Sequence, residues 1–189
     1  MLITVAFVLF SYFLGSLSTA IITCKFMGLA DPRSVGSSNP GATNVYELYG
    51  KKPAIITLIG DLLKGLLPVV LAKLYGLDAV ELSWVALASF FGHLYPLFFK
   101  FEGGKGVATA FGVILGLNLF VAVAVLISWL LVLKVFKLSS LSALISSLLT
   151  PLYFYLLDEQ YLVMSLVLSA FLIWRHRSNI KKIIDGTET

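Results

Sequence analysis

The chain has 189 residues, of which 59% are hydrophobic and 13% are charged, and its mean hydropathy is +0.96. Soluble domains are about half apolar and about a quarter charged, so this composition excludes an ordinary soluble protein and predicts an all-α membrane protein that forms a single domain over residues 1–189. The single cysteine excludes an internal disulfide, and the two histidines are too far apart to predict a metal site. We therefore expect no metal and no cofactor.

Six apolar runs follow one another along the chain, and a helix needs about 20 apolar residues to span a bilayer. In order, they cover residues 2–24, 54–75, 82–99, 107–133, 138–157 and 161–174. The first run has no basic leader and no cleavage site, which predicts a retained helix and not a signal peptide. Most runs fit one crossing. Run 107–133 fits either one long crossing or two short crossings that break near residues 116–118.

The charges decide between these two possibilities. If run 107–133 crosses twice, the chain has about seven crossings, some of them short, with its N-terminus outside and its C-terminus in the cytoplasm. The cytoplasmic side then receives Lys25, Arg33, Lys51, Lys52, Lys100, Lys105, Lys134, Lys137, Arg175, Arg177, Lys181 and Lys182. The outside receives only Lys73, near a helix end, together with four acids. This strong positive-inside pattern favours seven crossings and explains the net charge of +4 without nucleic acid.

Three polar runs interrupt the apolar ones, and in this topology all three fall on the cytoplasmic face. The first, GSSNPGATN at residues 36–44, lies in a loop too long for a mere connector. Glycines allow turns in which successive N–H groups point at one anion, and hydroxyls and amides add neutral donors. The candidate phosphate-binding residues here are Gly36, Ser37, Ser38, Asn39, Gly41, Thr43 and Asn44. The alternative is a polar turn that caps the following helix.

The second polar run, GGKGVAT at residues 103–109, resembles part of a nucleotide P-loop but lacks its spacing. Val107 follows Gly106 where a P-loop has the hydroxyl that binds magnesium, so ATP binding is weakly supported. What is left is Lys105 among Gly103, Gly104 and Gly106 at a helix start, where exposed N–H groups favour an anion. The alternative is that Lys105 only sets the topology.

The third polar run, HRSNIKKIIDGTE at residues 176–188, follows the last crossing. Its cations could simply anchor that helix to anionic lipid, but this does not account for Asn179. Within the crossings, Asp61 and Lys64 are three residues apart on one helix face and predict either an ion pair or a lysine that reaches a substrate phosphate. His93 is either a structural hydrogen-bonding residue or part of the site.

The chain resembles the bacterial acyl-phosphate:glycerol-3-phosphate acyltransferases over nearly its whole length. The resemblance rests on GSSNPGATN (family form close to GSGNxGATN), DLLKG at 61–65, GHLYPLFFKFEGGKGVAT at 92–109 and HRSNIKKIIDGTE. It implies a seven-helix protein of the bacterial inner membrane with its site on the cytoplasmic face. It also implies transfer of a fatty acyl group from acyl phosphate to the 1-hydroxyl of glycerol 3-phosphate, which yields lysophosphatidic acid. The implied partners are these two substrates and membrane lipid.

The resemblance also implies roles for individual residues. Ser37, Asn39, Thr43 and Asn44 would bind phosphate and orient the acyl donor. Gly103, Gly104, Lys105 and Gly106 would form a second cradle, while His176 and Asn179 would orient the acceptor or the carbonyl, with His93 in support. Acyl phosphate carries a good leaving group, so proximity and fixed donors can suffice. The substrate's own phosphate can serve as the base. A covalent role for Ser37 is less favoured, because no triad partners are evident.

Three residues depart from the family pattern. Ser38 occupies the usual place of a glycine, Glu47 that of an arginine, and Glu102 that of a non-acidic residue before GGKG. Two extra carboxylates would repel dianionic substrates unless nearby bases pair with them. The alternative to an active acyltransferase is therefore a divergent relative that binds phospholipid or phosphate esters without efficient transfer.

Overall fold

The computed structural model describes residues 1–188, and every regular element in that range is a helix. Ten α-helices and two short 3-10 helices follow in order. They are α1 (Leu2–Gly15), α2 (Thr19–Phe26), α3 (Ala42–Tyr49), α4 (Lys51–Tyr75), α5 (Ala79–Leu94), η1 (Leu97–Phe99), α6 (Val107–Leu117), α7 (Leu119–Phe136), α8 (Ser139–Leu157), η2 (Glu159–Tyr161), α9 (Leu162–Arg175) and α10 (Arg177–Ile184). The chain divides into two compact units, unit 1 (Met1–Leu117) and unit 2, which starts at Asn118.

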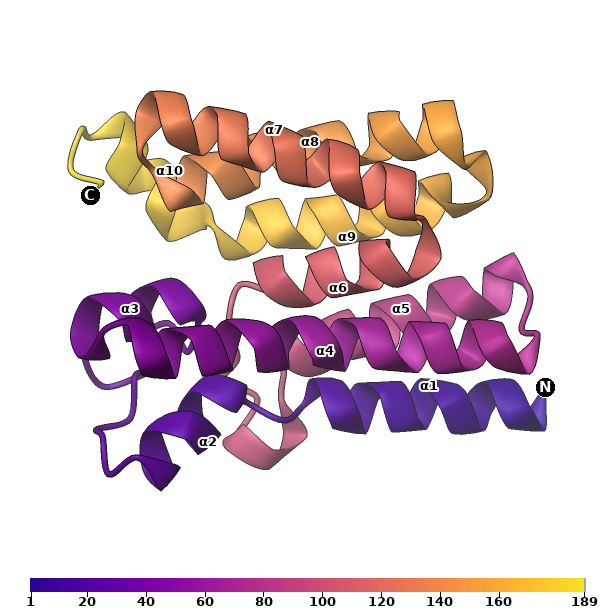
Figure 1. Cartoon of the computed structure of the whole chain (residues 1–189), viewed down its shortest axis with the longest axis horizontal. Helices are drawn as coiled ribbons and strands as arrows, with labels where there is room; N and C mark the ends of the chain where they lie inside the picture. Colours follow the sequence, from indigo (N-terminus) through magenta and orange to yellow (C-terminus); the bar gives the residue numbers. More distant parts are fainter. Residues whose placement is uncertain (189) are drawn as a thin grey trace. The chain divides into compact units, whose positions relative to one another are not determined.

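Close helix packing holds unit 1 together. α1 packs along α5, and α4 packs along α6, the second pair being visible in Figure 1. A side chain on Gly15 would collide with the carbonyl of Ser89, and one on Gly65 would collide with the carbonyl of Thr109. Lipid tails are as apolar as leucine side chains, so helices in a membrane associate through this kind of close backbone contact. Small residues therefore occupy the helix contacts, while large apolar side chains remain exposed.

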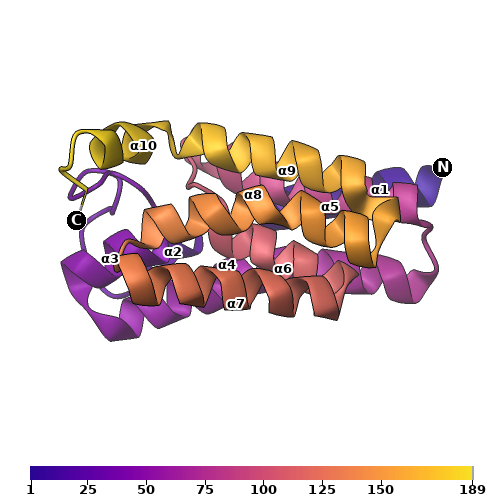
Figure 2. The ribbon, with the colours of Figure 1, turned by 90° about the horizontal axis from the view of Figure 1, so that it is seen from above.

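Serine hydroxyls add the polar contacts between the helices of unit 2. α7 packs along α8 and α8 along α9, as Figure 2 shows. The Ser128 and Tyr153 hydroxyls lie 2.6 Å apart, and the Ser169 hydroxyl donates to the carbonyl of Ser147 at 2.7 Å. Asn118 caps α7 by accepting from the N–H groups of Phe120 and Val121. These contacts satisfy polar groups that lipid cannot solvate.

Four helical segments of the described chain are long and apolar enough to cross a membrane. They are Lys51–Tyr75, Ala79–Phe99, Leu119–Phe136 and Ser139–Leu157, and a fifth forms if α1 and α2 make one bent span. The break predicted near residues 116–118 is confirmed, because α6 ends at Leu117 and α7 begins at Leu119. α6 has 11 residues, which at about 1.5 Å per residue is shorter than the hydrocarbon core.

Run 2–24, expected to be one continuous crossing, is instead bent by 44° between α1 and α2. The bend lies at residues 16–18, where the helical hydrogen bonding is interrupted. The Lys64 ammonium donates to the carbonyl of Leu17 at 2.8 Å, which satisfies one of the acceptors that the break releases. The backbone can leave the helix at membrane depth because a neighbouring helix supplies the lost partner.

Candidate active site

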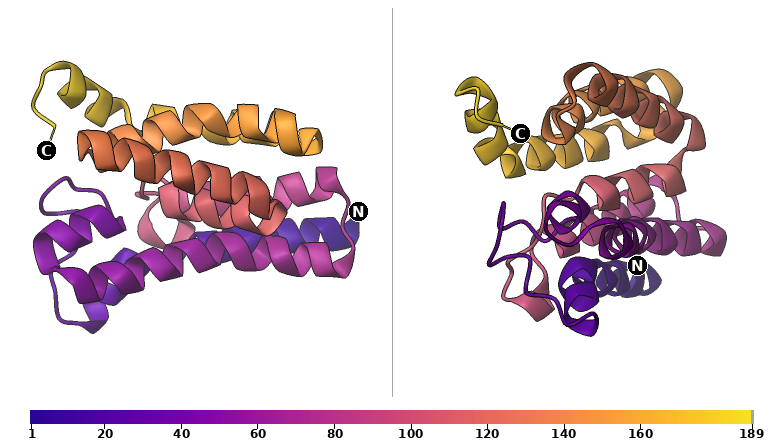
Figure 3. Two further views of the ribbon diagram at one scale, coloured as in Figure 1. Left: turned by 45° about the horizontal axis from the view of Figure 1, so that its top comes forward. Right: turned by 60° about the vertical axis from the view of Figure 1, so that its left-hand side comes forward.

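The first polar run, residues 36–44, is here named the serine loop. Its last three residues form the start of α3, and Figure 3 shows this region together with α2 and the start of α4 at one end of unit 1. Its organising side chain is Asn44, which is 1% exposed. The Asn44 amide nitrogen donates to the carbonyls of Pro32 at 2.9 Å and Asn39 at 3.0 Å, and its oxygen accepts from the N–H of Ser37 at 3.0 Å. Asn44 therefore shapes the loop from within.

The serine loop contains two residues with left-handed backbone. Gly36 has φ +62° and Ser38 has φ +56°. At Gly36 a side chain would also collide with the Asn44 amide, so glycine is required there. Ser38 is the position at which the resembled family usually has glycine, and its positive φ gives the physical reason for that preference. The side chains of Ser37, Ser38 and Thr43 are exposed, and Asn39 is half-buried.

The second run, residues 103–106, is here named the glycine loop and leads into α6. Gly103, Gly104 and Gly106 are buried against the end of α5, and Lys105 is half-buried. A side chain on Gly103 would collide with the backbone carbonyls of His93 and Leu94, and one on Gly104 with the His93 ring. Gly106 has φ +87°. The glycines therefore allow the loop to lie directly on α5.

A buried polar cluster lies beside the glycine loop. The Asp61 carboxylate is 2.8 Å from the Lys64 ammonium, accepts from the Thr19 hydroxyl at 2.6 Å, and lies 3.5 Å from His93 Nδ1. Asp61, Lys64 and His93 are 3%, 4% and 6% exposed. Of the two alternatives for Lys64, the intrahelical ion pair is observed. Sequence patterns indicated Asp61 with Lys64, but they carried no signal for Thr19 or for the contact with His93.

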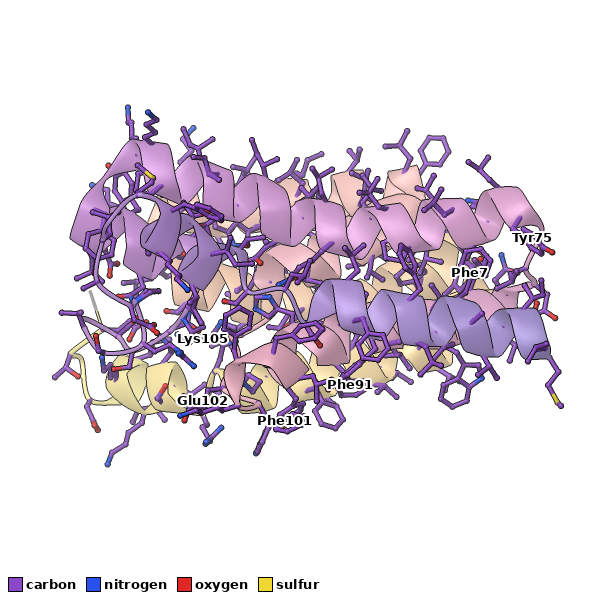
Figure 4. All side chains as sticks on the ribbon, turned by 90° about the horizontal axis from the view of Figure 1, so that it is seen from below. Phe7, Tyr75, Phe91, Phe101, Glu102 and Lys105 are labelled. Atoms are coloured by element: carbon purple, nitrogen blue, oxygen red, sulfur yellow. The ribbon has the colours of Figure 1, made fainter. Side chains whose placement is uncertain are left out.

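Arg33 joins the serine loop region to the segment before the glycine loop. Its guanidinium contacts the Asp31 carboxylate at 2.7 Å, the Glu102 carboxylate at 3.1 Å and the carbonyl of Phe99 at 3.2 Å. The hydrogen bonds from Arg33 lower the pKa of Asp31, against the opposing effect of its partial burial. Figure 4 labels Glu102 and Lys105 in this region. Glu102, one of the two extra carboxylates, therefore has a basic partner in Arg33.

Unit 2 contributes His176 and Asn179, at the junction of α9 and α10. His176 is 2% exposed, and its Nδ1 lies 2.8 Å from the carbonyl of Leu172. A carbonyl only accepts, so Nδ1 carries the proton and Nε2 is unprotonated in the neutral ring. The Asn179 amide nitrogen donates to the Glu188 carboxylate at 2.6 Å, while its buried oxygen has no hydrogen-bond partner. A buried acceptor without a partner is rare in a folded protein, and a catalytic role is one of the explanations for it.

Comparison with known proteins shows which family the chain resembles in sequence and fold. A model of the glycerol-3-phosphate acyltransferases matches residues 5–186. The chain belongs to the glycerol-3-phosphate acyltransferase family. The relative from Hydrogenovibrio crunogenus is 56% identical over 181 residues, which cover 94% of this chain and 87% of the relative. The one from Thioalkalivibrio sulfidiphilus is 53% identical over 190 residues, covering 100% and 94%. Both are named glycerol-3-phosphate acyltransferase.

A solved member of the glycerol-3-phosphate acyltransferase family has the same fold. The crystal structure of PlsY (YgiH), an integral membrane glycerol 3-phosphate acyltransferase, in its glycerol 3-phosphate form, matches with a TM-score of 0.94 and 38% identity. The match covers 98% of this chain and 94% of PlsY. The lysophosphatidic acid form matches with a TM-score of 0.92 and 36% identity. The family therefore includes an integral membrane protein, consistent with the apolar spans of this chain.

Proposed function

We propose that this chain transfers a fatty acyl group from acyl phosphate to the 1-hydroxyl of glycerol 3-phosphate, which yields lysophosphatidic acid and phosphate for phospholipid synthesis. The observation that carries the proposal is the family match over residues 5–186, which includes the first two polar runs and residues 176–186 of the third. The forms of PlsY with glycerol 3-phosphate and with lysophosphatidic acid support the acceptor and the product. The acyl phosphate donor follows from the resemblance of the motifs.

The reaction is an acyl transfer that needs positioning more than a strong catalyst. The acceptor hydroxyl attacks the carbonyl carbon of the mixed anhydride, the carbon–oxygen bond to phosphate breaks, and the hydroxyl proton leaves with the phosphate. Binding both substrates in line removes most of the entropic cost of such a step. Donors placed around the developing oxyanion and the departing phosphate lower its barrier further.

We assign roles to the predicted site residues on this basis. In the serine loop, Ser37, Asn39 and Thr43 bind the donor phosphate, while Gly36, Gly41 and Asn44 give the loop its shape. In the glycine loop, Gly103, Gly104 and Gly106 also bind the donor phosphate through backbone N–H groups, and Lys105 adds a positive charge. His176 and Asn179 orient the acceptor or the carbonyl. Asn44 takes the shaping role because its hydrogen bonds are made within the loop.

The topology belongs to the same proposal. The chain is one functional domain of the bacterial inner membrane with seven crossings, its N-terminus outside and its polar runs on the cytoplasmic face. Cysteine accessibility labelling in a Cys24→Ser background tests it, since Cys24 is the one native cysteine. Probes at exposed positions near Gly41, Gly104 and Asn179 should react from the cytoplasmic side, and probes near Asp78 and Asp158 from outside. Opposite sides for Gly41 and Asn179 would contradict the seven-crossing count.

The activity is tested with purified protein, palmitoyl phosphate and glycerol 3-phosphate. We expect phosphate and lysophosphatidic acid in equal amounts, no product with palmitoyl-CoA in place of the acyl phosphate, and loss of both products in His176→Ala. Product from palmitoyl-CoA alone would reassign the donor. The protein could instead bind palmitoyl phosphate and form no product under conditions in which another family member is active. That result would favour the alternative suggested by Ser38, Glu47 and Glu102, a divergent relative without efficient transfer.

A further inference from the structure

The cluster beside the glycine loop contains charged side chains although it is buried, where charges are costly. Asp61 and Lys64 form an ion pair whose members are both at least nine-tenths buried. Taking two charges out of water costs several kcal/mol for each ion, and apolar replacements of such pairs are often as stable. Stability alone therefore gives little reason for the pair. The best-attested use of buried polar groups is to select one arrangement of their surroundings.

The hydrogen bonds of the cluster show what it arranges. The Lys64 ammonium spans the Asp61 carboxylate and the carbonyl of Leu17, at the bend between α1 and α2. Thr19, in the first turn of α2, donates to the same carboxylate oxygen at 2.6 Å. That oxygen also faces His93 Nδ1 at 3.5 Å. The carboxylate thus joins three separate elements, α2, α4 and α5, at one oxygen atom.

His93 connects the cluster to the glycine loop. One edge of its ring faces Asp61, and the Nε2 edge lies where a side chain on Gly104 would be. The His93 carbonyl also accepts from the N–H of Gly104 at 3.3 Å. Both the ring and the backbone of one residue therefore contact the loop. The orientation of the ring is in turn set by a carboxylate that Thr19 and Lys64 hold in place.

We propose that Asp61 and Lys64 are positioning residues for acyl transfer. They act through His93, which sets the distance between the backbone of the glycine loop and the end of α5. The cluster fixes the His93 ring, the ring supports Gly104, and Gly104 places the loop N–H groups at the distance that a phosphate requires. Sequence patterns left open direct contact of Lys64 and His93 with substrate. In this proposal neither residue contacts the substrate, and both support the glycine loop from the side that faces α5. The proposal rests on the proposed function in one respect, namely that the phosphate bound by the glycine loop is that of an acyl phosphate.

A double-mutant cycle between His93 and the two loop glycines tests the link. A side chain at Gly104 collides with the ring, whereas one at Gly103 collides with backbone carbonyls that His93→Ala leaves in place. We expect Gly104→Ala to lower kcat/KM for palmitoyl phosphate about tenfold in the native background and about threefold or less with His93→Ala. Gly103→Ala, the matched control, should cost the same factor in both backgrounds. Equal cost of Gly104→Ala in both backgrounds would overturn the proposal.

The role of the ion pair is tested with a neutral replacement. Asp61→Asn with Lys64→Gln puts amide donors and acceptors in place of the charged groups and leaves no unpaired buried charge, so the double variant should fold. We expect KM for palmitoyl phosphate to rise about tenfold with kcat within about twofold, because the loop is displaced while the reacting groups are intact. Ser11→Ala, which removes an equally buried hydroxyl contact to the carbonyl of Val85, should leave KM unchanged. A lower melting temperature with unchanged KM would show that the pair is only structural.

Binding separates this proposal from the proposed function. Stabilisation of the protein by palmitoyl phosphate alone, measured as a shift in melting temperature, needs no turnover. If the native protein binds palmitoyl phosphate but forms no lysophosphatidic acid, the proposed activity fails, and the same cycle is then scored on binding. Coupling between His93 and Gly104 in the binding data would uphold the positioning role. Additive effects on binding would overturn it.

Discussion

The serine loop and the glycine loop are both candidate phosphate-binding segments, but different forces hold them in shape. The serine loop is exposed and is held by one side chain, Asn44, whose amide contacts three backbone segments. The glycine loop is buried and is held by the close approach of its backbone to α5. In the serine loop, the hydrogen bonds of the Asn44 side chain hold the backbone in shape. In the glycine loop, the lack of side chains on the glycines allows the backbone to contact α5. A change of volume should therefore damage the glycine loop most, and a change of hydrogen bonding the serine loop.

The largest effect is expected at Gly104. Gly104→Leu places a branched side chain against the His93 ring and lifts the loop from α5, so kcat/KM for palmitoyl phosphate should fall about a hundredfold or more. Gly28→Asn is the matched control, since Gly28 has a positive φ but open space around it, and asparagine tolerates that backbone. Steady-state phosphate release measures both. Unchanged kinetics in Gly104→Leu would show that the loop is only a helix start.

Asn44→Ala should have the next largest effect. It leaves the Ser37 N–H and the carbonyls of Pro32 and Asn39 without the amide, and lost buried hydrogen bonds cost about 1–3 kcal/mol each. We expect a fall of roughly twentyfold in kcat/KM together with a lower melting temperature. Tyr49→Phe, which removes an exposed contact from the same helix to the carbonyl of Ala30, should change neither quantity measurably. If Asn44→Ala keeps full activity, the loop does not depend on this side chain.

Glu47 tests whether charge near the serine loop limits activity. It is exposed on α3, at the position where the resembled family usually has arginine. Glu47→Arg removes a repulsive charge and adds a bidentate donor, so kcat/KM should rise about tenfold, which needs only about 1.4 kcal/mol. Glu47→Gln separates the two causes, because it removes the charge without adding the donor. Slower turnover in Glu47→Arg would mean that the site is built around the glutamate.

Ser38 tests the backbone of the serine loop. Its left-handed conformation costs a side-chain-bearing residue roughly 1 kcal/mol, so Ser38→Gly should raise the melting temperature by about 2–4 °C. Ser34→Gly is the opposite control: Ser34 is exposed, does not have a positive φ, and donates to the carbonyl of Asp31. That change should lower the melting temperature. Thermal unfolding in detergent measures both, and a destabilising Ser38→Gly would contradict the backbone argument.

The smallest effect concerns the contact of Asp31 with Arg33. The pKa of Asp31 is lowered in the folded protein, so its contribution to stability is present above the unfolded value of about 3.9 and is lost as the pH falls through the folded pKa. Exposed pairs are weak, so Arg33→Gln should lower the melting temperature at pH 7 by only about a degree or two. The difference between the two proteins should shrink below about pH 4. A difference that persists at low pH would assign it to the hydrogen bond from Arg33 to the carbonyl of Phe99.

Local patterns in the sequence predicted the features that depend on neighbouring residues. The break near residue 117, the glycines around Lys105 and the Asp61–Lys64 pair all follow from short spacings. The contacts that assemble the site join distant segments, such as Arg33 with Glu102 and Asp61 with His93, and no periodicity indicates them. The bend at residues 16–18 was also missed, because its freed carbonyl is satisfied by Lys64 from another helix.

Direct transfer of the acyl group, with no intermediate on the protein, is the central claim, and isotope exchange tests it. Native protein is incubated with palmitoyl phosphate and labelled inorganic phosphate in the absence of glycerol 3-phosphate. Direct transfer predicts no label in palmitoyl phosphate, because no acyl-enzyme exists for phosphate to attack. Exchange at a rate comparable to turnover, abolished by Ser37→Ala, would contradict the claim and make Ser37 a covalent nucleophile.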